Sequence, residues 1–431
     1  MKKFLSMFLL ILLLISCDKK KPILGERKAI FLNNNSILVD GGLNDIKISN
    51  AKTFINYYGN DSLLNQEIVN YKVDSLEFNE YSISRKKFGV KTYFFSSPVI
   101  VGNIIYYLDT NGNLIAKNLN NMEKVLWKTR IIERYNFINY YGGKLSFYYD
   151  TIYITTRLNE VIAVDKDGTM KWRKKLNTIP ISTPVIEGDS LYVITNDNKL
   201  YALDTEDGRI KWISYGNVKD SAILGSANPV IYGDYVIASY SSGELFILNK
   251  NTGETVFNLN LTGKYMIFSN FELTDIDSTP AVKDGILIAT ANNGITVAID
   301  LETMKVMWKH NLASLTNVII DEDLVFLITT DNTMVCLNLV DGKINWFKEF
   351  DRYKDMINKK DMIFYRNIAL INGKLYAFNN INQYKIINPL NGELEDTVDT
   401  LFMLYSIPYS LDGKLYSIGL KGRTIEIIES K

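Results

Sequence analysis

Side chains suited to catalysis are scarce in this sequence. It contains one histidine, His310, and two cysteines, Cys17 and Cys336. Nucleophilic catalysis by a Ser–His–Asp or Cys–His arrangement needs an imidazole base, and a lone histidine two residues after Trp308 is more typical of an incidental surface position. A histidine-rich metal site and a Cys-x-x-Cys zinc site are both ruled out by these counts. We therefore expect no catalytic residue, no metal site and no bound cofactor.

Carboxylates are numerous, but their placement indicates turns. Asp109, Asp165, Asp204 and Asp300 are each interpreted as occupying the same position of a repeated unit, whereas a unique active site would not recur. The D-x-D-x-D-G spacing of a calcium loop is absent. Paired carboxylates for glycoside chemistry stay open as an alternative, because pairs formed in space cannot be read from a sequence.

Five tryptophans also recur once per repeat. A carbohydrate-stacking set would use such rings, yet a ring at one position of each repeat favours a structural role, in which it packs on the neighbouring repeat and its indole N–H donates a hydrogen bond. Cys336, within the apolar run MVCLNL, is expected to be a small buried side chain. The repeated tryptophans are Trp127, Trp172, Trp212, Trp308 and Trp346.

The first sixteen residues have the composition of an export signal. Lys2 and Lys3 precede an apolar run that ends at Cys17 and is too short for a stable membrane span. A small residue directly before the cysteine resembles the lipobox of bacterial lipoproteins, which implies lipidation of Cys17 and anchoring of the mature chain by its acyl chains (palmitate among them). Asp18 resembles the inner-membrane retention signal of enterobacterial lipoproteins, so outer- and inner-membrane anchoring both stay open.

These residues must be positioned by a repeated β unit, seen most clearly between Pro184 and Trp212. Short runs rich in Val, Ile and Tyr alternate with Gly, Asn and Asp, which is typical of antiparallel strands joined by tight turns. Asp204 is expected to accept backbone N–H groups across the last turn, and Gly208 to adopt the positive φ that closes it. The unit is a four-stranded sheet with two apolar faces, so it needs neighbours of its own kind.

Related units occur eight times at a period of roughly forty to fifty residues, which predicts an all-β, eight-bladed β-propeller of four-stranded antiparallel blades. The last copy, from Pro408, supplies only three strands, and the β-rich segment 73–83 is expected to complete it and close the ring. The predicted domains are a signal peptide (1–16), a lipidated tether (17–70) and the propeller (71–431). The copies begin at Pro98, Lys144, Pro184, Pro229, Pro280, Val318, Ala369 and Pro408.

Charge argues against nucleic acid as a partner. Without Lys2 and Lys3 the chain carries 46 basic and 48 acidic side chains, and no basic stripe is present. The connections between repeats vary in length and several are aromatic, and such inserts on one face of a repeat protein usually mark its binding surface. The connections are 128–143, 213–228, 258–279 and 347–368.

Two resemblances follow from these residues. The pattern Ala202-Leu203-Asp204, Gly208 and Trp212 resembles the tryptophan-docking repeat of quinoprotein-type (PQQ-like) propellers, although the adjacent cysteine pair of many such enzymes is missing. Three further segments and the lipobox resemble the BamB family, the lipoproteins of the outer-membrane β-barrel assembly (BAM) machinery, most closely the alphaproteobacterial type. Those segments are LGERKAIFL (24–32), LGSANPVIYG with SSGELF (224–246) and DIDSTPAV (275–282).

The BamB resemblance implies a partner surface on the connections entering the fourth and fifth copies. Asp275 and Asp277 match the family's pair of aspartates, Ile223 stands where a leucine is found, and Gly225 matches a glycine. Leu224 replaces an arginine, and a serine at 221 replaces another leucine, which weakens the charged part of that contact. Loop capping is the alternative role for the two aspartates.

The resemblance further implies a non-enzymatic scaffold. It would be a monomer within a hetero-complex, lipid-anchored at the periplasmic face of the outer membrane, that binds the periplasmic domains of the barrel-inserting subunit and aids insertion of β-barrel proteins. Two alternatives stay open: a quinoprotein-like or carbohydrate-active propeller enzyme, and an envelope module that binds sugars or peptides.

Overall fold

The repeat unit folds as its turns predict. In the computed structural model, residues 185–215 form the antiparallel strands β10 (Val185–Glu187), β11 (Ser190–Thr195), β12 (Lys199–Asp204) and β13 (Ile210–Tyr215). Between β12 and β13, Oδ1 of Asp204 accepts the N–H of Glu206 at 2.9 Å, and the N–H of Gly208 donates to the Asp204 carbonyl at 3.0 Å. Gly208 has a φ of +73°, a conformation that costs glycine little.

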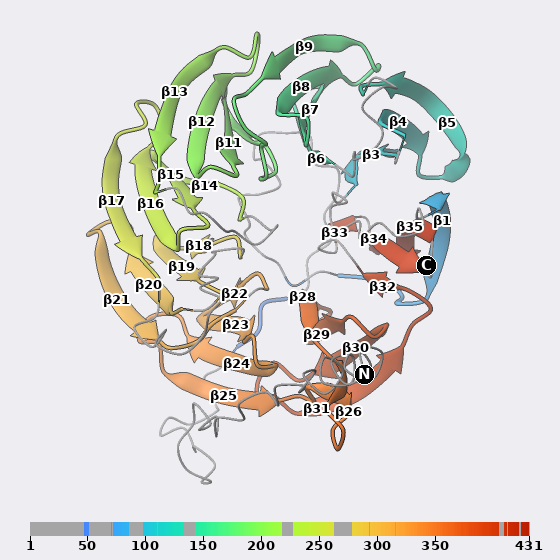
Figure 1. Cartoon of the computed structure of the whole chain (residues 1–431). Coiled ribbons are helices and arrows are strands. Elements are labelled where there is room, and N and C mark those ends of the chain that lie inside the picture. The colour runs from blue at the N-terminus through green and yellow to red at the C-terminus, as the bar shows by residue number, and fades with distance from the viewer. Residues whose placement is uncertain are drawn as a thin grey trace, which may run out of the picture. The chain divides into compact units, whose positions relative to one another are not determined.

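The structure describes residues 47–50, 70, 72–85, 98–109, 111–132, 143–217, 227–262, 278–292, 294–314, 316–404, 409–411, 413–421 and 424–430. These residues contain strands and turns and no helix, and among them nothing helical is long and apolar enough to cross a membrane. Their sheets are arranged as an eight-bladed propeller, as predicted (Figure 1).

Seven blades are formed by consecutive segments of the chain, each with its first strand innermost and its fourth outermost (Figure 1). Besides the blade of β10 to β13, they comprise β2 (Val99–Val101), β3 (Ile104–Leu108), β4 (Asn113–Asn118) and β5 (Asn121–Arg130); β6 (Gly143–Tyr148), β7 (Thr151–Thr156), β8 (Glu160–Asp165) and β9 (Met170–Lys175); and β14 (Val230–Tyr232), β15 (Tyr235–Ser239), β16 (Glu244–Asn249) and β17 (Thr255–Asn260). The next three are β18 (Ala281–Lys283), β19 (Ile286–Thr290), β20 (Thr296–Asp300) and β21 (Lys305–His310); β22 (Ile319–Asp321), β23 (Leu324–Ile328), β24 (Thr333–Asn338) and β25 (Ile344–Glu349); and β28 (Tyr365–Ile371), β29 (Lys374–Asn379), β30 (Gln383–Ile387) and β31 (Leu394–Asp399).

The eighth blade joins the two ends of the described chain, which confirms the predicted closure. Strand β1 (Phe78–Arg85) pairs antiparallel with β35 (Thr424–Ser430), and β35 pairs with β34 (Lys414–Lys421). Figure 1 shows blue β1 beside red β35. Two short strands, β32 (Met403–Leu404) and β33 (Tyr409–Leu411), both pair with β34, so the inner position is divided between them.

The segment before β1 lies along the ring. Ser49 donates its N–H to Oδ2 of Asp321 at 2.9 Å, and Asn70 accepts the N–H of Gly373 at 2.7 Å. The N–H of Asp74 then donates to the Gly413 carbonyl at 2.7 Å. Asp321, Gly373 and Gly413 lie at the turns between the first two strands of blades six, seven and eight. Residues 47–50, 70 and 72–77 therefore form a strap across three blades.

Antiparallel strands give each blade two ends of different kind. The turns joining strands one to two and three to four lie at one end, which we call the turn face. The turns joining strands two to three, and the connections between blades, lie at the other end, which we call the loop face. Isolated bridges between Pro180 and Thr195 and between Ser314 and Thr329 tie blade connections to such turns on the loop face.

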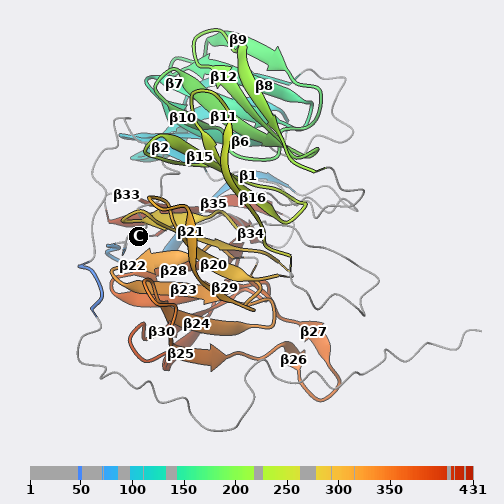
Figure 2. The ribbon, with the colours of Figure 1, turned by 90° about the vertical axis from the view of Figure 1, so that its left-hand side faces the viewer.

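The connection predicted at 347–368 is shorter than expected and contains its own sheet. Strand β25 continues to Glu349 and β28 begins at Tyr365. Between them, β26 (Tyr353–Asp355) and β27 (Lys360–Met362) form a two-stranded hairpin that projects at the lower right of Figure 2. The sequence of this hairpin mixes charged and apolar residues without the regular alternation of a strand, so the sequence alone does not predict these two strands.

The core lies between neighbouring sheets. Tyr153 and Trp172 of the second blade belong to one buried cluster with Leu191, Tyr201 and Leu203 of the third. Because each sheet packs both faces against its neighbours, its middle strands are largely apolar and buried, as in β11, where all six residues are buried. Burial of this kind between like units is the reason repeat blades are stable only together.

Candidate partner-binding face

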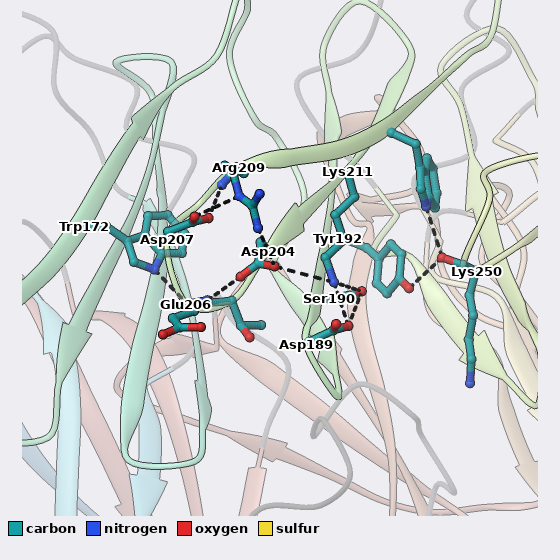
Figure 3. A network of polar contacts seen from close by, with 12 residues as sticks. Trp172, Asp189, Ser190, Tyr192, Asp204, Glu206, Asp207, Arg209, Lys211 and Lys250 are labelled. Carbon is teal, nitrogen blue, oxygen red and sulfur yellow. Dashed lines mark hydrogen bonds and ion pairs between the residues drawn. The ribbon is translucent and has the colours of Figure 1, made fainter.

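The repeated tryptophans connect each blade to the next. Every indole N–H donates to a backbone carbonyl of the following blade, at 2.8 to 3.2 Å. Figure 3 shows Trp172 reaching the turn that follows Asp204. The donor and acceptor pairs are Trp127 with Lys166, Trp172 with Thr205, Trp212 with Lys250, Trp308 with Leu339, and Trp346 with Pro389.

Each ring also lies against the glycine of the turn it reaches. A Cβ placed on that glycine would lie 2.4 to 2.9 Å from the ring, closer than real side-chain contacts allow. A positive φ and the absence of a side chain are therefore both needed at these turns. The glycines are Gly168, Gly208, Gly253, Gly342 and Gly392.

The interface between the fourth and fifth blades departs from this arrangement in both partners at once. Phe257 replaces the tryptophan in the fourth blade, and the facing turn of the fifth blade has Met304 with a φ of +54° where the other turns have glycine. Both side chains belong to one apolar cluster with the buried Leu301. Phenylalanine has no N–H that needs an acceptor. Its ring is also smaller than an indole, which leaves room for the Met304 side chain to pack at this interface.

The acidic side chains act mainly in turns. Asp165, Asp204 and Asp300 end the third strand of their blades and accept backbone N–H groups two residues on. Asp109 does not share that position, contrary to expectation. It lies in the turn between β3 and β4, where its Oδ1 accepts the N–H of Asn113 at 2.8 Å.

Charged side chains around the third blade's turns pair locally (Figure 3). Lys211 Nζ lies 2.6 Å from Asp189, and Arg209 Nε lies 2.8 Å from Asp207. Hydrogen bonds from Lys211 and Ser190 lower the pKa of Asp189. Within each pair the two charges neutralise one another on the turn face. Exposed ion pairs of this kind contribute little to stability.

The remaining reactive side chains are engaged or buried. His310 Nε2 lies 2.7 Å from the Gly342 carbonyl. Cys336 is fully buried, and this burial raises the pKa of its thiol to about 12. Within the described ranges, no group of three or more His, Cys, Asp or Glu side chains could hold a metal ion.

The residues predicted for partner binding lie outside the described part of the chain. Ile223, Leu224 and Gly225 fall in 218–226, and Asp275 and Asp277 in 263–277, as Cys17 falls in the N-terminal region. Both internal segments join the outer strand of one blade to the inner strand of the next, so their described ends lie on the loop face.

The structure brings the downstream ends of those two segments together. The N–H of Asn228, just after the first segment, donates to Oγ1 of Thr279, just after the second, at 3.1 Å. Asn228 Oδ1 in turn accepts the N–H of Thr183 at 2.8 Å, and Thr279 donates its N–H to Asn317 at 3.2 Å. Four successive blades are thereby linked by a polar belt where their inner strands begin.

Sequence reasoning did not identify this belt, although a signal was present. A polar residue directly precedes proline at Thr183, Asn228 and Thr279. Proline has no N–H, and at Asn228 and Thr279 the residue before it supplies both an N–H donor and a side-chain acceptor. The repeated dipeptide therefore marks the position where neighbouring blades exchange hydrogen bonds.

Tyr215 is a second residue that sequence reasoning missed. It ends β13 directly before the first predicted segment, is 63% exposed, and lies 5.6 Å from Lys199 Nζ, which is placed over its ring. The opposite end of residues 213–217 is fixed by Asn198, whose side chain donates to the Asn217 carbonyl at 2.6 Å. An exposed aromatic side chain on a backbone segment that is held in place is typical of protein interfaces.

Fold and repeat contacts together define the class: an all-β propeller of eight blades built from PQQ-type, tryptophan-docking repeats. Within that class the resemblance is to BamB. The family described as outer membrane protein assembly factor BamB matches residues 139–348. BamB of Yersinia pestis is 24% identical over 255 residues, which cover 58% of this chain and 65% of that protein, slightly less than two thirds of its length.

The chain is also similar to a further relative and to two solved structures. An uncharacterised protein of Rickettsia prowazekii (strain Madrid E) is 25% identical over 402 residues, covering 88% of this chain and 89% of that one. The crystal structure of BamB from Moraxella catarrhalis has a TM-score of 0.65 at 19% identity, covering 82% of this chain and all 100% of that chain. A europium-containing methanol dehydrogenase has a TM-score of 0.61 at 11% identity and covers 81% of this chain and 85% of its own, which shows a shared fold alone. The chain is a BamB-like propeller of PQQ-type repeats.

Proposed function

We propose that this protein is a non-enzymatic accessory subunit of outer-membrane protein assembly. Its loop face would bind the periplasmic domains of the barrel-inserting subunit and so aid insertion of β-barrel proteins. The main support is the similarity to BamB in both sequence and fold. The hydrogen bond between Asn228 and Thr279 adds support, because it joins the residues that follow the two candidate segments.

The location follows the same proposal. Residues 1–16 would direct export, Cys17 would carry the lipid, and residues 17–70 would link the anchor to the ring at the periplasmic face of the outer membrane. Ser49 and Asn70 contact the blades, so the tether would meet the ring at these residues.

Co-purification tests the proposal. The mature chain, captured from detergent-solubilised envelope, should recover the barrel-inserting subunit. The double variant Asp275→Ala/Asp277→Ala and the single variant Tyr215→Ala should each reduce that recovery. Glu206→Ala is the matched control, because Glu206 is exposed on the turn face and should leave recovery unchanged.

The results would distinguish the proposed function from the alternatives. Recovery of unrelated partners alone would overturn the proposed function. Equal loss in Glu206→Ala and in the loop-face variants would show instead that binding does not use the loop face.

A further inference from the structure

The hairpin of β26 and β27 exposes apolar side chains at its tip. Ile357 is 92% exposed and Met356 54%, while Met362 on the returning strand is 57% exposed. Exposing a large aliphatic side chain to water is unfavourable, and a single site with three such residues on a projecting element marks a contact surface. This hairpin is separate from the connections that carry the predicted partner residues.

The base of the hairpin is held firmly by the two flanking blades. Asn332, buried in the sixth blade, donates its side-chain N–H to the Ile363 carbonyl at 2.8 Å and to the Asp351 carbonyl at 3.1 Å. Asn380 of the seventh blade donates to the Met362 carbonyl at 3.0 Å. The base of the hairpin is therefore already fixed before any partner binds, so binding would cost little conformational entropy.

The tip satisfies its own polar groups. Oδ1 of Asp355 accepts the N–H of Ile357 at 3.1 Å and the N–H of Asn358 at 3.0 Å, and its other oxygen accepts the Asn358 side chain at 2.8 Å. These bonds engage the Asp355 carboxylate within the turn. Met356 and Ile357 are exposed on a turn in which the N–H groups of Ile357 and Asn358 already have an acceptor. Burying this turn would therefore leave fewer unpaired donors.

Positive charge surrounds that tip. Lys354, Lys359 and Lys360 are exposed, and none of the three takes part in an ion pair between described residues. With Asp355 and Asp361, residues 353–364 carry a net charge of +1, whereas the sequence as a whole is neutral. Tyr353 and Phe364 lie at the base, where β26 begins and β27 ends.

From this order of an apolar tip, lysines and an aromatic base we propose that the hairpin dips into the surface of an anionic membrane. Aliphatic side chains would enter the headgroup boundary, the lysines would meet lipid phosphates, and the aromatic rings would lie at the interface. A protein hot spot needs a matching pocket that excludes water around it, whereas a convex tip enters a bilayer without one. The inference rests on the proposed function only for placing the chain beside a membrane.

Site-directed fluorescence tests this contact. The lipidated Ile357→Cys chain, labelled with an environment-sensitive nitrobenzoxadiazole dye, is bound to vesicles of phosphatidylethanolamine and phosphatidylglycerol. Native Cys336 is fully buried, so labelling is confined to the new thiol. We expect a blue-shifted emission and about two-fold quenching by nitroxide-labelled lipid. Glu206→Cys, exposed on the turn face, is the matched control and should show neither change.

The charge variant and the alternatives complete the test. Lys359→Glu/Lys360→Glu in the labelled chain should abolish the shift while leaving the thermal transition unchanged, because both side chains are exposed. An equal shift at residues 357 and 206, no shift with vesicles, or a shift only when envelope proteins are added would each overturn the membrane contact. Pure lipid and pure protein suffice, so this result does not depend on recovery of the barrel-inserting subunit.

Discussion

Glycine and tryptophan depend on each other where one blade meets the next. The indole needs an acceptor and a flat surface, and the turn needs a residue that tolerates positive φ without a side chain. Phe257 and Met304 illustrate the dependence, because the interface between blades four and five has neither the tryptophan nor the glycine. This pairing explains why a weak repeat, visible only as scattered Asp, Gly and Trp residues, specifies a regular interface.

Gly342→Ala should therefore be costly for two separable reasons. The alanine would have to keep the backbone φ of +70°, and its Cβ would lie 2.6 Å from the Trp308 ring. Gly188→Ala is the matched control, since Gly188 has a φ of +60° with nothing within 4 Å of the added atom. We expect Gly342→Ala to lower the free energy of unfolding by about 1–3 kcal/mol more than the control, measured by urea denaturation. Equal losses would contradict the role of the ring.

At the scale of elements, strands and turns followed from the sequence far better than connections did. Apolar runs between Asp, Asn and Gly identify the blades, since each tight turn has a local cause. The strap has no such cause: Ser49 bonds to Asp321, 272 residues away, and nothing periodic marks it. The hairpin of β26 and β27 mixes charged residues with Met356, Ile357 and Met362 in no regular alternation. The belt through Asn228 and Thr279 depends on contacts between blades.

The candidate site was predictable only in part. Its location on the blade connections follows from the variation in their lengths, and the individual residues at 223–225, 275 and 277 come from the resemblance to BamB. Tyr215 could not be selected among 27 tyrosines, because exposure is a property of the folded ring. Sequence patterns therefore predict local turns well, but they predict contacts between distant residues poorly.

Shortening the chain from its N-terminus should separate the contribution of the strap to stability from that of the closing strand β1. A chain starting at residue 47 keeps every described contact and should unfold at the temperature of the mature chain. One starting at residue 78 removes the strap and leaves Asp321, 3% exposed, without Ser49, which should cost about 1–3 kcal/mol.

A chain starting at residue 86 also lacks β1, and with it the ion pair between Glu80 and Lys421 and the contact of Phe78 with Phe402 at 5.1 Å. The open edge of β35 should then cause aggregation, visible by size-exclusion chromatography. Identical melting of the chains starting at 47 and 78 would show that the strap contributes nothing.

For the whole molecule, closure by β1 and β35 determines how the repeats unfold. An open array of repeats can lose units from its ends, because each unit contacts only its neighbours. In a closed ring every blade has two neighbours, and removal of any one opens two interfaces. Unfolding of this ring should consequently be cooperative, even though its blades are similar and locally formed.

Two intrinsic probes can test that cooperativity in a Cys17→Ser chain. The five tryptophans report on blades one, two, three, five and six, and Cys336 reports on the sixth. Because burial raises the pKa of the Cys336 thiol to about 12, it should stay protonated and unreactive toward thiol reagents at pH 8 until the sixth blade opens. Thiol reactivity and tryptophan emission should then change at the same urea concentration. Reaction of Cys336 at lower urea than the emission change would mean that the sixth blade opens alone and that closure does not couple the ring.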